Sequence, residues 1–343
     1  MDAEPDAALW VTAGATDAAR AIREGAVTSL ELEQVRSLYC ATKPMVAMGV
    51  LALLERAGVD WTTARVDPRG RLRQDGAWAI PDLLARRTPL LRPTFWEVLR
   101  LPLGRAEPEL AARAEQSAAT GGGVSGNSEV LAWYVLAEAA AHLAGAGWAG
   151  ALQRELRAVV GPRLWLVPDR ELLDLPLEAM STLTAAHDGA EVPLVYALTV
   201  RSRALTSPYL GGYGSFAAVV SWFQALGCHL RGGARPSPLF PDAARLRATL
   251  GEAARGDGPG PPRAAVGLDV VVAADGRPRF GLQAAGGALS VELDPATGAV
   301  TGVLGSRFLA EPGRRREWLT AELAAARAWA DGVRAVTAGE ARS

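Results

Sequence analysis

The chain of 343 residues contains almost no lysine and almost no asparagine, with one of each, Lys43 and Asn127. All 35 other basic residues are arginine, a bias typical of GC-rich coding sequences because lysine and asparagine codons are rich in adenine. Arginine stays charged at any working pH, whereas a shielded lysine can titrate near neutrality and act as a base. Lys43 is therefore a candidate catalytic residue. The alternative is chance survival of one surface lysine.

Cysteine, histidine and net charge are also low. The net charge of −1 argues against a nucleic-acid-binding protein, which needs a basic stripe. The three histidines lack the spacing of metal ligands, so we expect no metal or other cofactor. The acidic N-terminus has no apolar signal segment, and the longest apolar stretch, 130–152, is interrupted by charge. We therefore expect a cytoplasmic protein without a membrane span, with Cys40 and Cys228 both reduced.

Hydrophobic periodicity predicts alternating blocks of strand and helix. In chain order, we expect a strand at 9–12, a buried helix at 43–56, helices at 80–100, 107–120, 128–143 and within 151–185, a flexible turn at 211–214, a helix at 215–226, a linker at 255–262, strands at 266–273, 279–283, 288–293 and 300–304, and a helix at 316–333. This order predicts an α+β fold, an antiparallel sheet flanked by helices with an inserted all-helical lobe.

Four segments carry a resemblance when taken together. Cys40-Ala-Thr-Lys43-Pro44 precedes an apolar helix, and 80–88, 125–128 and 280–287 follow at suitable spacings. In this order they resemble the motifs of the serine β-lactamase and penicillin-binding-protein family, in particular its class C and esterase-like branch. The resemblance covers about residues 30 to 310. It implies one unit over 1–343, with an α/β lobe at about 1–60 and 205–343 and a helical lobe at about 61–204.

The motifs also depart from the family pattern. Cys40 stands in place of the nucleophilic serine, Ser125 in place of the tyrosine of the second motif, and Leu282 in place of the histidine or lysine of the third. The acid/base tyrosine and the polar side chain of the third motif are therefore missing. We do not expect a conventional β-lactamase.

The remaining residues still support acyl transfer. Residues three apart share a helix face, so Lys43 can reach Cys40, and a nearby ammonium and a helix N-terminus both favour a thiolate. The resemblance implies that Asn127 accepts a hydrogen bond from Lys43, and that the backbone N–H groups of Cys40 and Ala285 form the oxyanion hole. It also places the substrate beside Ser125, Leu282, Gln283 and Ala284 of these segments. Tyr213, in the glycine-rich loop outside them, is a candidate to supply the missing phenol and to contact the substrate, with core packing or a loop anchor as the alternative.

Three functions stay open. The first is a cysteine acyltransferase, cyclase or hydrolase acting on a small-molecule or carrier-bound acyl group, in a tailoring step of bacterial specialised metabolism. The second is a non-covalent cyclase, lyase or isomerase that reuses the pocket, and the third is a non-catalytic binding protein. Structural roles are the alternatives for single residues: Cys40 as a small buried side chain, Asn127 as a helix N-cap and Leu282 as a core residue. Cys228 and His229 are adjacent and point apart on a helix, so we do not expect a catalytic pair there.

Overall fold

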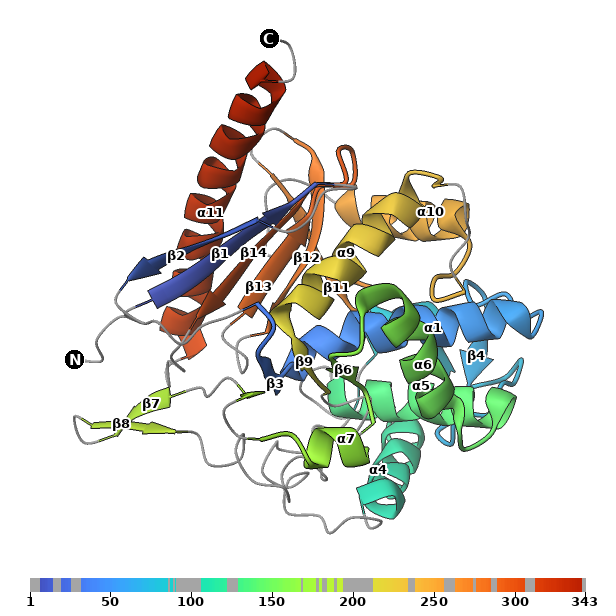
Figure 1. Cartoon of the computed structure of the whole chain (residues 1–343). Coiled ribbons are helices and arrows are strands. Elements are labelled where there is room, and N and C mark those ends of the chain that lie inside the picture. Colours follow the sequence, from blue (N-terminus) through green and yellow to red (C-terminus); the bar gives the residue numbers. More distant parts are fainter. Residues whose placement is uncertain are drawn as a thin grey trace.

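The chain folds around one large antiparallel sheet with helices on both faces (Figure 1). The computed structural model describes residues 7–14, 20–25, 32–85, 87–88, 90, 106–121, 129–167, 169–176, 179–180, 184–187, 190–193, 212–233, 238–255, 263–273, 276–284, 289–305 and 312–340. Helix and antiparallel strand are mixed along this chain, as the α+β prediction requires. The lobe boundaries at residues 61 and 204 stay a prediction.

The large sheet joins the two ends of the chain. Its strand order is β10-β11-β12-β13-β14-β1-β2, and every neighbouring pair is antiparallel. The strands are β1 (Ala7–Ala13), β2 (Arg20–Gly25), β10 (Arg263–Ala265), β11 (Leu268–Val272), β12 (Pro278–Ala284), β13 (Leu289–Leu293) and β14 (Val300–Gly305). The N-terminal hairpin therefore extends a sheet that the C-terminal strands build.

The two faces of this sheet carry different side chains, because successive residues of a strand point to opposite faces. On β13, Leu289 and Val291 pack into the main core, while Glu292 faces α11 (Pro312–Glu340) and pairs with Arg327 at 3.7 Å. On the same outer face, Trp10 packs against α11 and donates from Nε1 to Glu322 at 2.8 Å. Helix α11 thus covers one face of the sheet.

Helix α9 (Phe216–Leu230) packs on the other face, against β13 and β14. Helix α1 (Thr42–Arg56) forms the centre of the core. Twelve of its fifteen residues are buried, which explains why its sequence has no polar stripe. At Gly49 the helix is so close to a neighbouring helix that a Cβ would lie 2.5 Å from Leu152 Cδ1. The other helices are α2 (Ile80–Leu84), α4 (Ala106–Ala119), α5 (Glu129–Ala144), α6 (Trp148–Val160), α7 (Arg170–Leu173) and α10 (Ala243–Ala254).

Three small sheets complete the described structure. One of them, in the order β3-β9-β6, lies beside the start of α1 (Figure 1). The strands of the small sheets are β3 (Val35–Ser37), β9 (Tyr213–Ser215), β6 (Leu164–Trp165), β4 (Arg65–Val66), β5 (Trp78–Ala79), β7 (Thr184–His187) and β8 (Ala190–Pro193).

Several predicted elements are confirmed and others are wrong. The strand at 9–12 is the centre of β1, the helix at 43–56 is α1, and the strands at 279–283, 288–293 and 300–304 are β12, β13 and β14. The turn predicted at 211–214 is wrong where it is described, because residues 213–215 form the central strand β9. The helix predicted at 80–100 ends at Leu84 as α2, and residues 91–100 lie outside the described part.

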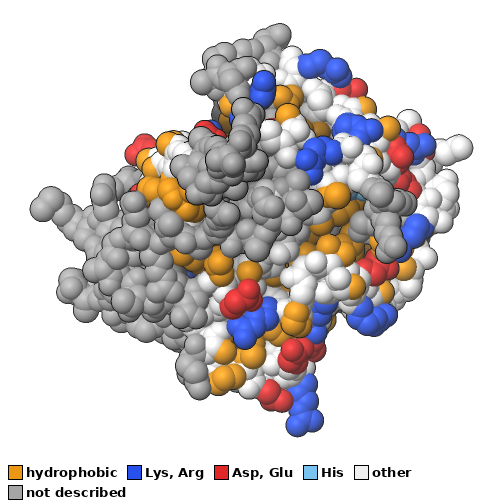
Figure 2. Space-filling model, turned by 45° about the horizontal axis from the view of Figure 1, so that its top comes forward, with side chains coloured by type: hydrophobic (Ala, Val, Ile, Leu, Met, Phe, Trp, Pro, Cys, Tyr) orange, Lys and Arg blue, Asp and Glu red, His pale blue; other side chains and the backbone are white. Residues whose placement is uncertain are grey.

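Within the described residues, no helix has the length and hydropathy needed to cross a membrane. In the same part of the chain, no three or more of histidine, cysteine, aspartate and glutamate come together as a metal site would require. On the face shown in Figure 2, the described basic and acidic side chains are interspersed over the surface.

The turn between β13 and β14 is tied to the neighbouring strand β12. Asp294 forms an ion pair with Arg279 of β12, and its Oδ1 accepts from the Ala296 N–H at 2.9 Å. Burial opposes the charge on Asp294, but the hydrogen bonds from Arg279 and Ala296 outweigh it and lower the pKa of this carboxyl below its ordinary value. The ion pair therefore helps to fix the register of β12.

We expect Asp294→Asn to lower the free energy of unfolding by about 1–2 kcal/mol at pH 7, the scale of a charged hydrogen bond that is partly exposed. A carboxyl whose pKa is lowered by folding stabilises the native state above its unfolded pKa of about 3.9, and this stabilisation is lost as the pH falls through the folded value. The difference from wild type should therefore shrink towards pH 3 in urea titrations. The exposed carboxylate Asp75 provides the control, since Asp75→Asn should change little at either pH. An equal loss at pH 7 and pH 3 would contradict the prediction.

Candidate active site

Cys40 and Lys43 lie on one continuous helical segment at the head of α1. Cys40 sits in the 3₁₀ turn η1 (Tyr39–Ala41), which runs directly into α1 with helical backbone angles at Ala41 and Thr42. In this geometry, side chains three residues apart stand on the same side. Cys40 is partly buried, and Lys43 is only 6% exposed. From this spacing we expect the chain's one lysine to lie on the same side as the predicted nucleophile.

The N-terminal end of α1 has no acidic side chain near it in the sequence of its first turn. A helix N-terminus carries partial positive charge from its unsatisfied N–H groups. The first position of α1 also has no side-chain cap. A protonated Lys43 would add a full positive charge at the same end. This arrangement favours an anion near Cys40, such as the oxyanion of an acyl-transfer intermediate.

Gly212 ties the chain together on both sides of Cys40. Its carbonyl accepts from the Leu38 N–H at 2.8 Å, and its own N–H donates to Thr42 Oγ1 at 3.2 Å. The Thr42 hydroxyl in turn donates to the Tyr39 carbonyl, closing the turn that carries Cys40. A Cβ at Gly212 would lie 2.4 Å from the Trp165 carbonyl oxygen, so only glycine fits here.

The residue before Cys40 has a strained backbone. Tyr39 has φ 45°, in the left-handed region that residues other than glycine rarely adopt, at a cost of about 1–3 kcal/mol. Close to it lies Arg36, which is 1% exposed and donates from Nη1 to the Gly305 carbonyl at 3.3 Å. Burial lowers the pKa of Arg36 to about 10, and Tyr39 partly opposes this shift. The segment before Cys40 is therefore anchored to the end of β14.

The predicted third motif lies on β12, which packs against η1. Leu282 and Ala284 are buried in the main core. Gln283 points to the opposite face, where its Nε2 donates to Thr320 Oγ1 of α11 at 3.1 Å. Leu282 and Gln283 therefore do not share one face of the strand. Ala285 lies outside the described residues, as do Ser125 and Asn127 of the second motif.

Tyr213 packs into a small core of its own. It is 3% exposed at the centre of the β3-β9-β6 sheet, in a cluster with Val35, Trp165 and Met180. Gly214, the next residue, explains why 213–215 form a strand and not a flexible turn. A Cβ at Gly214 would lie 3.0 Å from both Leu38 and Leu164, so the small residue allows close packing of three strands.

Cys228 and His229 do not form a pair. Cys228 is exposed, whereas His229 is buried and its Nε2 lies 2.8 Å from the Pro241 carbonyl oxygen. This placement agrees with adjacent residues pointing apart on α9.

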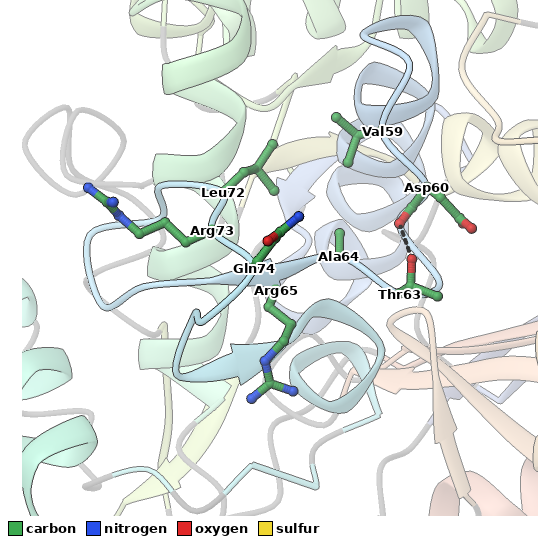
Figure 3. A pocket seen from close by; sticks show the side chains of 8 residues that line it. All are labelled: Val59, Asp60, Thr63, Ala64, Arg65, Leu72, Arg73 and Gln74. Carbon is green, nitrogen blue, oxygen red and sulfur yellow. Dashed lines mark hydrogen bonds between the residues drawn. The ribbon is translucent and has the colours of Figure 1, made fainter.

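An open hollow of about 450 Å³ lies at the other end of α1 (Figure 3). It is lined by Val59, Asp60, Thr63, Ala64, Arg65, Leu72, Arg73 and Gln74. A helix of fifteen residues spans about 20 Å, so this hollow is not part of the surroundings of Cys40. The Arg65 guanidinium is already bonded to the Gly76 carbonyl at 2.8 Å.

No local pattern in the sequence points to Thr42, Gly212 or Arg36 as parts of this site. Thr42 lies inside the first motif, but its partner Gly212 is 170 residues away along the chain. Only the folded chain shows that the three residues hold the Cys40 turn.

No protein-family model matches this sequence, and no curated protein matches it. Solved structures do match. D-amino acid amidase from Ochrobactrum anthropi SV3 has a TM-score of 0.64 at 13% identity, covering 88% of this chain and 86% of that one. A penicillin-binding protein homologue from Pyrococcus abyssi has a TM-score of 0.60 at 12% identity, with coverage of 88% and 70%.

Simvastatin synthase from Aspergillus terreus, in a mutant form, has a TM-score of 0.56 at 15% identity, covering 94% of this chain and 91% of that one. These structures share the serine β-lactamase and penicillin-binding-protein fold, and the present chain has that fold too, as its motifs predicted.

We expect Thr42→Val to loosen the Cys40 turn, because it removes the hydroxyl that bonds Gly212 and Tyr39 while keeping the size of the side chain. A buried N–H left without an acceptor costs about 1–3 kcal/mol. Urea unfolding should show a loss of this size, and alkylation of Cys40 by iodoacetamide should slow.

Thr42→Ser keeps the hydroxyl and is the matched control. It should stay closer to wild type in both measurements. If the serine and valine variants behave alike, the hydroxyl does not hold the turn.

Proposed function

We propose that this chain is an acyl-transfer enzyme in which Cys40 is the nucleophile and Lys43 is its activating base and thiolate partner. The observation that supports this most is the three-residue spacing of Cys40 and the chain's single lysine, at the point where η1 runs into α1. The fold adds support, since the similar structures include an amidase and a synthase. We place the protein in a tailoring step of bacterial specialised metabolism, where altered family motifs are expected.

The proposed first half-reaction forms a thioester. The Cys40 thiolate attacks the acyl carbonyl carbon, and the carbonyl π electrons move onto oxygen. The backbone N–H groups of Cys40 and Ala285 would stabilise this oxyanion. The carbonyl then re-forms and expels the leaving group, which takes a proton from the Lys43 ammonium. Cys40 is left acylated, and Lys43 is left neutral.

The second half-reaction releases the acyl group. An amine, alcohol, thiol or water attacks the thioester carbonyl and gives its proton to Lys43. Cys40 leaves as a thiolate, so the starting charges are restored. Asn127 is proposed to accept a hydrogen bond from Lys43 and to orient the substrate. A thiolate needs no separate strong base, which accounts for the missing tyrosine of the second motif.

The proposed substrate is a neutral acyl group, either on a small molecule or on a carrier. Leu282 and Ala284 are apolar and buried on the strand that packs against η1. A substrate carboxylate beside them would lose its hydration without gaining a partner, which is costly. Penicillins carry such a carboxylate and should therefore react poorly.

We expect a neutral aryl thioester to add its acyl mass to Cys40, and a penicillin of similar size to add none under the same conditions. Intact-mass spectrometry followed by peptide mapping measures both. Cys228 is an internal reference, because it is the more exposed thiol and would react first if exposure alone controlled the rate. Cys40→Ala should fold and form no adduct. Turnover of the thioester by Cys40→Ala would reject covalent catalysis here and favour a non-covalent enzyme.

Lys43→Arg separates charge from basicity, because arginine keeps the positive charge but does not titrate. We expect acylation of Cys40 to fall by about a hundredfold or more, the scale of a lost general base. Lys43→Met should be no better, and circular dichroism should show both variants folded. If the arginine variant keeps most of the wild-type rate, Lys43 acts through its charge alone.

A further inference from the structure

The turn between β10 and β11 has an unusual composition. Val266 and Gly267 form its two central residues, between the paired Ala265 and Leu268, with φ 53° and 78°. Two-residue hairpins with both central φ values positive favour asparagine, aspartate or glycine at the first position. Valine is branched at Cβ, and in this conformation it is a strained residue. Position 266 therefore carries a strained residue, although asparagine, aspartate or glycine would form the same turn with less strain.

The strained turn rests directly on the head of α1. A Cβ at Gly267 would lie 3.0 Å from Pro44 Cα, 3.1 Å from Pro44 N and 3.2 Å from the Lys43 carbonyl carbon. The backbone of the turn is thus in contact with the backbone of Lys43 and Pro44. The Val266 side chain is 1% exposed and belongs to the main core, which holds the turn in this conformation.

Backbone strain in this protein gathers around one segment. Among the described residues, Tyr39 and Val266 are the non-glycine residues with positive φ. Tyr39 precedes Cys40 directly, and the Val266 turn contacts Lys43 from the other side. Strained conformations persist only where the surrounding structure imposes them, and they cluster where geometry matters for function.

We infer that the Val266–Gly267 turn is a clamp that sets the position of Lys43 relative to Cys40, with Val266 as a positioning residue. The inference rests on the proposed function of these two residues. Its mechanical basis is the chain of pairings from β10 to β12. β11 pairs with β12, and β12 packs against η1. The same sheet therefore contacts the turn of Cys40 through β12 and the backbone of Lys43 through the β10–β11 turn.

The test compares two buried valines of the same hairpin. Val266→Ala and Val270→Ala remove the same two methyl groups from side chains that are 1% and 3% exposed. Val266→Gly is a second variant, which makes the turn without strain and so protects the test from a simple folding failure. All variants are compared with wild type well below their unfolding temperatures.

The first readout is the second-order rate of Cys40 alkylation by iodoacetamide across pH, with Cys228 as the internal reference. The clamp predicts that both Val266 variants react about tenfold more slowly near neutral pH, since small misplacements of catalytic groups have effects of this size or larger. Val270→Ala should stay within about twofold of wild type, because Val270 lies on β11 and outside the turn that contacts the Lys43 backbone. If wild-type Cys40 reacts faster than Cys228, but Val266→Ala and Val266→Gly match Val270→Ala, the clamp is rejected.

The second readout separates the clamp from the proposed function. Protein grown on ¹³C-lysine gives one lysine signal, because the chain contains a single lysine. The clamp predicts that the ε-methylene signal and its titration midpoint move in both Val266 variants and not in Val270→Ala. If wild-type Cys40 reacts no faster than Cys228 but the lysine signal still moves, the clamp stands and the catalytic proposal fails. An unmoved lysine signal rejects the clamp.

Discussion

The burial of helix α1 is the constraint on which the rest of this structure depends. An apolar helix with twelve of fifteen residues buried must be covered on every side. The large sheet and α9 lie on one side of the core, and α5 and α6 pack on the others. The N-terminal end of such a helix is fixed in space by its whole length. Residues at this end, such as Cys40 and Lys43, are therefore held in fixed positions, as a preorganised site requires.

Several features around the N-terminal end of α1 lower the stability of the folded state. A lysine that is 6% exposed loses most of its hydration, and Tyr39 and Val266 adopt strained backbone conformations. Burial of α1 and of the inner sheet face offsets these costs. Gly212 and Gly267 allow other backbone segments to approach closely, and a side chain at either position would collide with its surroundings. The strained backbone conformations and these close backbone approaches therefore both lie at or next to residues 39–44.

The sequence predicted the parts of the fold that depend on local patterns. The continuous apolar run of 43–56 is typical of a buried helix, and alternating residues with a turn at Asp294–Gly298 predict the β13–β14 hairpin. The ordered motifs predicted the fold, which similar structures share at 12–15% identity. The sequence predicts a turn at the position of strand β9, because glycines in a short segment are typical of flexible turns. This segment forms a strand because β3 and β6, distant along the chain, pack closely around Gly214.

By itself, the sequence determined that Cys40 and Lys43 share a helical turn, because three-residue spacing is a local property of a helix. It also singled out Lys43 as the one lysine of the chain. Only the tertiary structure decided how that turn is held. The Gly212–Thr42 bond joins residues 170 positions apart, Leu282 and Gln283 are separated by the faces of a sheet, and the Val266 turn meets Pro44 across the core. These contacts depend on which distant segments pair, and that is set by packing of the whole chain.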